Sequence, residues 1–348
     1  MTVPGIDWPR LAAWMGEHVP AAGAPVSVSL ISGGRSNLTY LVEATEQRVV
    51  LRRPPLGHVL PTAHDMRREW RVISALDGTP VPVPPPLAFC SDEDVIGAPF
   101  YLMGHVDGAA VRDRDELGAP GVEETRRLSQ RLAEVLAEIH AVDYTAVGLG
   151  DFGRPDGYLA RQLDRWCQQW ARSADREDPV YDRLVARLRE RMPATSAATL
   201  VHGDYRLDNT LVRLAPPEIR AVVDWEMSTL GDPLADLGLT LTYWHDHGDD
   251  ERASIPVAGD VTLAPGFLSA AEFAAHYAKV SGRDLADLDF YVAFGNFKLA
   301  VIVQGIHARF RQGKTVGEGF DRIGDAVPLL LARAHRTLDH RTLDHGIS

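Results

Sequence analysis

Three residues with oxygen-bearing side chains lie close together between positions 204 and 224. Asp204 follows a short apolar run and a His-Gly turn, Asn209 comes shortly after it, and Asp224 ends a second apolar run. Carboxylate and amide oxygens suit Mg²⁺, which usually takes one or two protein carboxylates and leaves its other positions to water and phosphate. These residue types therefore predict a magnesium site that works with a phosphate-bearing ligand.

Two strand-like runs are available to position these side chains. They cover residues 210–214 and 220–223, and Ala-Pro-Pro-Glu separates them. Two such runs around a proline-containing turn predict a β-hairpin. Antiparallel pairing brings the open ends of a hairpin together, so Asn209 and Asp224 are expected side by side, with Asp204 facing the same point.

The same order and spacing occur in protein kinases, which carry a catalytic Asp, an Asn five residues further on and then a second metal-binding Asp. Here the pattern reads HGDYRLDN followed by DWE. In this form it resembles the aminoglycoside phosphotransferase and choline kinase-like family. The branch that it resembles most includes the kinase-like domain of acyl-CoA dehydrogenase family members 10 and 11. Further matching motifs are SGGRSNLTYLV, VLRRPP, IGAPFYLM and VDWEMSTLGDPLADLG.

The resemblance implies a role for each matching position. Asp204 is expected to be the catalytic residue that accepts or orients the hydroxyl proton, and Asn209 and Asp224 are expected to hold Mg²⁺. The expected nucleotide is ATP, with GTP as the alternative. A glycine-containing turn is expected to cover its phosphates, and a hinge segment is expected to bind its base. The residues of these two segments are Ser32, Gly33, Gly34, Arg35, Ser36 and Asn37, and Met103, Gly104, His105 and Val106.

Arg52 departs from the kinase pattern. It occupies the position of the phosphate-binding lysine, and no lysine precedes Lys279. Arginine offers a planar, permanently charged fork in place of a compact ammonium, so it can still bind phosphate with altered geometry. Glu69, on a predicted helix, is its expected partner. The alternatives are that Arg52 and Arg53 are solvated residues at a strand end and that Glu69 is an ordinary exposed helix residue.

The expected fold class is α+β, in a two-lobed protein kinase-like arrangement. Residues 1–105 are predicted to form a small lobe of antiparallel strands, and residues 106–348 a larger, mainly helical lobe, with the nucleotide between them. Asp236 is expected to brace the catalytic loop. Apolar periodicity predicts helices and strands along both lobes. The helices cover 7–15, 65–76, 122–140, 158–170, 182–192, 269–280 and 288–310, with one starting at 231–233, and the strands cover 26–31, 38–43, 48–52 and 98–106.

Composition and charge limit the kinds of partner that we expect for the protein. The net charge of −12 disfavours a nucleic-acid partner. Two cysteines, no secretory signal pattern and no apolar run long enough to span a membrane favour a cytoplasmic protein, monomeric or homodimeric, without a membrane partner. The His- and Asp-rich segment 244–251 lacks the spacing of a strong zinc signature, so it is interpreted as a solvated loop or as one end of a cation-binding pocket.

The predicted reaction is phosphorylation of a hydroxyl on a small molecule. Glu226 stands where a protein kinase has glycine, and an A-P-E element is missing, which argues against protein substrates. The resemblance allows a hydroxyacyl-type acceptor, an amino alcohol or an aminoglycoside. The alternative from another class is a nucleotide-binding pseudo-enzyme with a regulatory role, suggested by Arg52.

Overall fold

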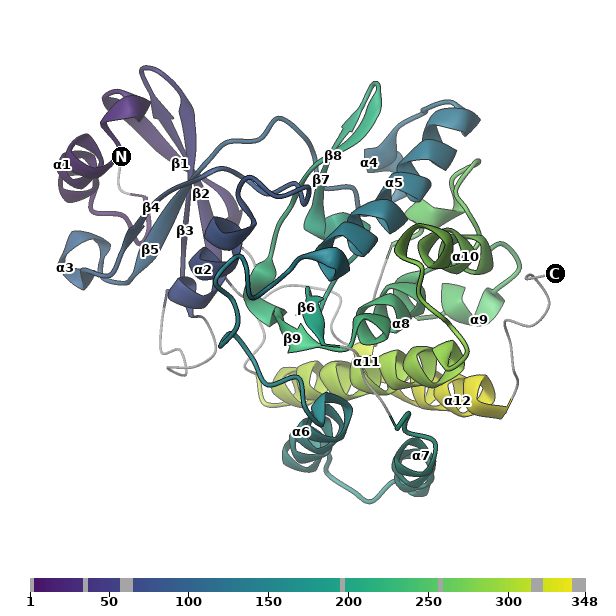
Figure 1. Cartoon of the computed structure of the whole chain (residues 1–348). Helices are drawn as coiled ribbons and strands as arrows, with labels where there is room; N and C mark the ends of the chain where they lie inside the picture. The colour runs from purple at the N-terminus through teal and green to yellow at the C-terminus, as the bar shows by residue number, and fades with distance from the viewer. Residues whose placement is uncertain are drawn as a thin grey trace. The chain divides into compact units, whose positions relative to one another are not determined.

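The structure is a computed structural model that describes residues 3–33, 37–56, 65–194, 198–255, 259–313 and 322–339. The chain divides into two compact units (Figure 1). Unit 1 comprises Met1–Gly108 with Arg220–Ser228, and unit 2 comprises Ala109–Ile219 with Thr229–Ser348. Strands dominate the first unit and helices the second, which confirms the predicted α+β class.

Unit 1 is built on a five-stranded antiparallel sheet with the order β1-β2-β3-β5-β4. The strands run over Pro25–Gly33 (β1), Leu38–Ala44 (β2), Arg48–Arg53 (β3), Pro86–Cys90 (β4) and Phe100–Gly104 (β5). Strand β4 was not predicted, because the proline-rich sequence at 81–86 is unfavourable for a strand inside a sheet. Pro86 is tolerated there because β4 lies at the edge of the sheet.

The two faces of this sheet receive different helices. Successive side chains of a strand point to opposite faces. Phe100 and Leu102 of β5 join the apolar cluster that includes Leu11 of α1 (Trp8–His18). The intervening Tyr101 instead contacts the Trp70 ring of α2 (Met66–Leu76). The same alternation applies to β3. Leu51 joins the apolar cluster on the α1 face of the sheet, and the next residue, Arg52, donates a hydrogen bond to Glu69 of α2 on the other face.

Local sequence explains where these helices begin. The side chain of Asp7 accepts a hydrogen bond at the start of α1, and that of Asp65 accepts two at the start of α2, so both helices have an N-cap. The cap at Asp65 was predicted from the sequence. A short helix α3 (Glu93–Ile96) completes the unit.

Unit 2 is mainly helical. Its elements include α4 (Arg114–Leu117), α5 (Val122–Ala141), α6 (Tyr158–Ser173), α7 (Pro179–Glu190), α8 (Pro233–Tyr243), α9 (Asp250–Ala253), α10 (Ala270–Ser281), α11 (Leu288–Arg311) and α12 (Ala326–Asp339). The predicted helices agree with members of this set within a few residues, but α12 and the short helices α4 and α9 were not predicted. Helix α7 is rich in arginine, but its apolar side, with Tyr181, Leu184 and Leu188, is buried.

Short strands hold the predicted catalytic segment. Strand β6 (Thr199–Val201) pairs with β9 (Thr229–Gly231) within unit 2. Strand β7 (Thr210–Leu214) forms a two-stranded sheet with β8 (Pro217–Val222), as the hairpin prediction required. No helix among the described residues has the length and apolar character needed to cross a membrane.

Candidate active site

Arg52 on β3 is a buried, doubly paired cation. Its Nε atom lies 2.9 Å from Oε2 of Glu69, and its second terminal nitrogen lies 2.5 Å from Oδ1 of Asp224. Only 12% of the Arg52 side chain and 1% of the Glu69 side chain are exposed. Burial would lower the pKa of Arg52, but the nearby carboxylates outweigh it and raise this pKa, so the guanidinium stays charged. Arg52 and Glu69 are therefore neither solvated residues nor an accidental pair.

Arg53 also differs from the expectation of a solvated strand end. Its side chain is buried, and its guanidinium donates hydrogen bonds to backbone carbonyls of Gly5, Pro54 and Ile96. Arg53 therefore ties the N-terminal segment and the end of α3 to the sheet. Its role is structural, because its donors are taken up by the protein's own backbone.

Asp224 has an unusual backbone conformation. Among the described residues it is the single non-glycine residue with positive φ, at 67°. Aspartate tolerates this left-handed region better than most residues, although it remains an uncommon conformation that clusters at functional sites. The side chain is 28% exposed, with Oδ1 held by Arg52. Asp224 is thus presented at the surface of unit 1 with one carboxylate oxygen anchored.

The predicted phosphate-covering turn lies partly outside the described residues. Gly34, Arg35 and Ser36 are not described, and Ser32 and Gly33 form the end of β1. Asn37, on the far side of the turn, is buried, and its Nδ2 donates to Oε2 of Glu226 over 3.3 Å. Glu226 therefore has a partner beside this turn.

The predicted hinge has fewer available backbone groups than expected. The N–H of Gly104 donates to the carbonyl of Pro85, and the N–H of His105 donates to the carbonyl of Arg48. The N–H of Val106 has no hydrogen-bond acceptor among the described residues. Met103 is buried, as predicted. Of the four residues, Val106 offers the backbone donor that a nucleotide base could use.

The catalytic segment of unit 2 is braced by Asp236 on α8. The carboxylate of Asp236 accepts the N–H of His202 at 2.6 Å and the N–H of Gly203 at 2.7 Å. Burial would raise the pKa of Asp236, but the contact with His140 outweighs it and lowers this pKa, so Asp236 is ionised. Gly203 has φ 85°, which favours glycine. The predicted bracing role of Asp236 agrees with these contacts.

Asn209 and Asp204 form one hydrogen-bonded unit. Nδ2 of Asn209 donates to the carbonyl of Asp204 at 2.8 Å and to its Oδ2 at 3.1 Å. Both amide hydrogens are used, which fixes the orientation of the amide and leaves Oδ1 of Asn209 without a donor among the described residues. Arg206 lies 3.7 Å from Asp204, and burial together with the charge of the Asp204 carboxylate raises the pKa of Tyr243.

The donor set can be tested for its fit to Mg²⁺. Asn209 offers an amide oxygen, and Asp224 offers its second carboxylate oxygen, so both sites present the hard oxygen donors that this ion prefers. Groups of three or more His, Cys, Asp or Glu side chains able to hold a metal are absent from the described residues. The residues fit an ion that keeps most of its positions for water and phosphate.

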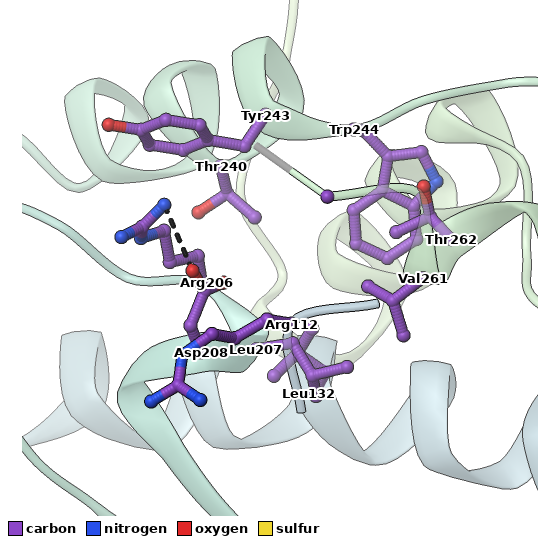
Figure 2. Close-up of a pocket in the computed structure, with 11 residues that line it drawn as sticks. Arg112, Leu132, Arg206, Leu207, Asp208, Thr240, Tyr243, Trp244, Val261 and Thr262 are labelled. Atoms are coloured by element: carbon purple, nitrogen blue, oxygen red, sulfur yellow. Dashed lines mark ion pairs between the residues drawn. The ribbon is translucent and has the colours of Figure 1, made fainter. Parts of the chain in front are cut away.

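A pocket opens beside the catalytic loop within unit 2 (Figure 2). About 400 Å³ of space, part of it open to solvent, lies between its lining residues. Arg206 lies across from the ring of Tyr243, 4.8 Å from its centroid, and is paired with Asp208 over 3.1 Å. The remaining lining residues are mostly apolar or weakly polar: Arg112, Leu132, Leu207, Thr240, Trp244, Gly259, Val261 and Thr262.

The His- and Asp-rich segment 244–251 is less solvated than expected. Trp244 and His245 are buried, and the carboxylate of Asp246 accepts the N–H of Ala270 at the start of α10. Asp249 is paired with Arg333 of α12 at 2.6 Å. Glu251 pairs with Arg333 and Arg336. Two of the four acidic side chains of this loop are thus paired with arginines of α12.

The sequence matches a known family. A model of the family described as "Phosphotransferase enzyme family" matches residues 27–282. The chain belongs to this phosphotransferase family. It is 34% identical over 347 residues to acyl-CoA dehydrogenase family member 11 of Rattus norvegicus, covering 97% of this chain and 44% of that protein. The chain thus spans less than half the length of this curated relative.

Solved structures of phosphotransferase type share the fold. A protein from Ralstonia eutropha with a provisional aminoglycoside phosphotransferase description is 36% identical, with TM-score 0.80 and coverage of 96% of this chain and 98% of that one. The GDP and kanamycin complex of an APH(2") enzyme is 18% identical, with TM-score 0.62 and coverage of 94% and 98%. The predicted family resemblance and the kinase-like fold are confirmed.

Several residues of this family member were given no role from the sequence. Lys298, Arg206 and Tyr243 all lie at the catalytic loop. Arg206 could have been noticed as the cation inside the loop itself. Lys298 and Tyr243 are distant in sequence, and only the packing of α8 and α11 brings them to this point.

Proposed function

We propose that the protein transfers the terminal phosphoryl group of ATP, with Mg²⁺, to a hydroxyl of a small molecule. Membership of the phosphotransferase family supports the reaction class. The observation that carries the proposal is the pairing of Asp204 with Asn209. It holds in place a carboxylate that would face the acceptor hydroxyl, and it leaves an amide oxygen that would bind the metal. A structural neighbour solved with GDP supports a nucleotide as the phosphoryl donor.

In the proposed reaction, the acceptor oxygen bonds to the terminal phosphorus while the bond from that phosphorus to the bridging oxygen breaks. Asp204 orients the hydroxyl and takes its proton, and the nucleoside diphosphate leaves. Asn209 and Asp224 would hold Mg²⁺, which supplies positive charge against the phosphate oxygens. Arg52, held by Glu69, would engage the phosphates, and the segments Ser32–Asn37 and Met103–Val106 would contact the nucleotide.

The pocket beside Arg206 and Tyr243 is the proposed binding site for the acceptor. Its apolar walls suit an aliphatic or ring portion, and its charged side chains suit polar substituents. Three acceptor classes are proposed for testing: hydroxyacyl compounds, because of the dehydrogenase-named relatives; aminoglycosides, because of the neighbour solved with kanamycin; and amino alcohols, because of the wider family.

The proposal is tested first by nucleotide binding. A ligand that binds only the native state raises stability by about 2.7 kcal/mol at one hundred times its Kd. We therefore expect millimolar ATP with Mg²⁺ to raise the melting temperature. The control is ATP with excess EDTA, which should raise it less. An unchanged melting temperature, together with no heat of binding in calorimetry, would reject the proposal.

Turnover is tested by measuring ATP consumption against a panel of the three acceptor classes. We expect one class to increase ATP consumption above the rate with water alone, and Asp204→Asn to abolish that increase. Nucleotide binding without acceptor-dependent turnover in any class would instead favour the regulatory pseudo-enzyme.

A further inference from the structure

Lys298, near the middle of α11, places an ammonium group at the catalytic loop. Its Nζ atom donates to the carbonyl oxygen of Gly203 at 2.6 Å, directly before Asp204 in the chain. The same Nζ atom lies 5.5 Å from the centroid of the Trp166 ring on α6. The ammonium is thus held between an aromatic face and a backbone carbonyl, both within unit 2.

Desolvating the ammonium group of Lys298 at this position costs free energy, so the presence of a lysine here needs an explanation. Its neighbours on α11, Phe297 and Leu299, are buried apolar residues, and a methionine would fill a similar volume without the cost of desolvating a charge. Burial lowers the pKa of Lys298, while the charges of Asp204 and Asp236 oppose that change and Arg165 adds to it. The surrounding carboxylates therefore favour the charged form.

The contact completes a support on both sides of one residue, Gly203, and so holds the two peptide units that it joins. Asp236 accepts the N–H of Gly203 at 2.7 Å, and Lys298 donates to the carbonyl of the same residue. With its N–H and its carbonyl both held, Gly203 has little freedom to rotate. The peptide plane that carries the N–H of Asp204 is then fixed, and with it the direction in which the Asp204 side chain leaves the backbone.

We propose that Lys298 is a positioning residue for phosphoryl transfer, which holds the Asp204 carboxylate toward the acceptor through the Gly203 carbonyl and balances its negative charge. The inference rests on the function proposed above. It assigns to α11 a part in the reaction: without the ammonium, the loop keeps its attachment to α8 through Asp236 but loses the second point that fixes the orientation of Asp204.

The coupling between Lys298 and Asp204 can be measured without any turnover. The chain contains three lysines, Lys279, Lys298 and Lys314, so selective labelling with ¹³C-lysine yields a simple NMR spectrum. Loss of one signal in Lys298→Met assigns it. We expect this signal to be shifted by the Trp166 ring and to titrate below that of exposed Lys279. Asp204→Asn should lower its pKa further and leave Lys279 unchanged.

Kinetics test the positioning role. Because misplacement of a reacting group by about 1 Å can cost on the order of 10²-fold in rate, Lys298→Met should lower kcat by roughly that factor. It should leave the KM for ATP within about twofold, since the kcat effect arises only in the transition state. Lys298→Arg, which keeps a donor and a charge, should recover part of the rate. Lys279→Met, at an exposed position of α10, is the matched control and should behave as wild type.

The double variant separates positioning from a merely structural role. Because Lys298 acts through Asp204, adding Lys298→Met to Asp204→Asn should reduce kcat little further. Multiplicative losses, or a Lys298 signal that titrates like Lys279 and ignores Asp204→Asn, would overturn the inference. If the wild-type protein transfers no phosphoryl group, the proposed function fails on that result, while the NMR measurement still decides whether Lys298 is coupled to Asp204.

Discussion

At the scale of single residues, the two aspartates have distinct environments. Asp204 accepts a hydrogen bond from the amide of Asn209, with Arg206 and Tyr243 close by. Asp224 is held by one oxygen on Arg52 and has a left-handed backbone. The first arrangement suits a carboxylate that receives a hydroxyl proton, and the second suits a carboxylate that offers an oxygen to a metal. Their removal should therefore have different consequences.

Asp204→Asn keeps the shape of the side chain and removes the base. General-base contributions are typically about 10²- to 10⁴-fold, and the loose transition state of phosphoryl transfer favours the lower half of that range. We expect kcat to fall by that order with ATP affinity nearly unchanged. Asp224→Ala should weaken binding of ATP with Mg²⁺ as well. Calorimetry and single-turnover rates on both variants check this, and equal loss of ATP affinity in both would show that the roles are wrongly assigned.

Arg52 also has a stability role that was not expected from the sequence. Removing one partner of a buried ion pair leaves an unpaired charge and costs about 3 kcal/mol or more. We therefore expect Arg52→Ala to lower the free energy of unfolding by that amount and to weaken ATP binding. Arg52→Lys, a point charge in place of a fork, should retain more stability but cannot hold Glu69 and Asp224 with the same geometry.

The control for Arg52 must itself leave the fold intact. Arg53→Ala is unsuitable, because the buried Arg53 side chain bonds to three backbone carbonyls. Arg10, with 62% of its side chain exposed and one hydrogen bond to the carbonyl of Asp94, is the better control; Arg10→Ala should leave ATP binding unchanged and lower the free energy of unfolding by about 1 kcal/mol at most. Urea unfolding and calorimetry measure both effects. If Arg52→Ala binds ATP as well as Arg10→Ala does, Arg52 does not engage the nucleotide.

At the scale of elements, two helices of unit 2 carry the supports of the catalytic loop. Asp236 lies on α8 and Lys298 on α11. The helices approach closely at Gly238, where a Cβ atom would lie 2.4 Å from the backbone carbonyl oxygen of Tyr291. Glycine permits this approach because it has no side chain. Gly238 thus sets the distance between the two helices. The sequence shows the glycine but does not show that a second helix packs against it.

Gly238→Ala should therefore be destabilising despite the better helix propensity of alanine. Overpacking a well-packed contact costs typically about 1–3 kcal/mol. Gly16→Ala on α1 is the matched control, since its Cβ would meet no atom within 4 Å. That change should stabilise by roughly 0.5–1 kcal/mol. Urea unfolding of both variants checks the prediction. Stabilisation by Gly238→Ala would show that the two helices can separate without cost.

Much of this framework could be predicted from local sequence. Apolar periodicity and cap residues such as Asp65 located most helices, and the spacing of Asp204 and Asn209 located the catalytic loop. The proline in edge strand β4 argued against predicting a strand there. The proline in α12 argued against predicting a helix, although proline is tolerated in the first turn of a helix. Lys298 lies 95 residues from Gly203. No local pattern encodes that contact, because it depends on how α11 packs.

At the scale of the whole molecule, stability should depend on the pH through buried histidine. His140 on α5 is buried, and burial lowers its pKa below the ordinary value near 6.5, although the contact with Asp236 opposes the change. The neutral ring bonds to Asp236 through Nε2 at 3.3 Å and to the hydroxyl of Tyr277 through Nδ1 at 2.7 Å. His245 is buried too, and burial followed by the charge of Arg252 lowers its pKa.

The sign of the effect follows from proton binding in the two states. As the pH falls below about 6.5, the unfolded chain protonates these histidines while the native protein does not, so the unfolded state gains protons and the free energy of unfolding falls. Each histidine contributes at most about 1.4 kcal/mol per pH unit, and its contribution is fully present above about pH 6.5. The lowered pKa of Asp236 acts in a separate window, below about pH 4.

The contribution of His140 can be isolated with His140→Gln, whose amide can still donate to Asp236 but does not titrate in this range. At pH 7.5 we expect the variant to be less stable than wild type, because the fit to Tyr277 is lost. At pH 5.5 the gap should be narrower, since only wild type loses the His140 contribution on acidification. Urea unfolding at the two pH values measures both gaps, and subtracting them removes the effects of His245 and of the buried carboxyls. A gap that stays constant would mean that His140 titrates alike in the folded and unfolded states. In that case His140 would be protonated at pH 5.5 in the folded protein, and the contacts of Asp236 with the catalytic loop would persist beside a charged imidazole.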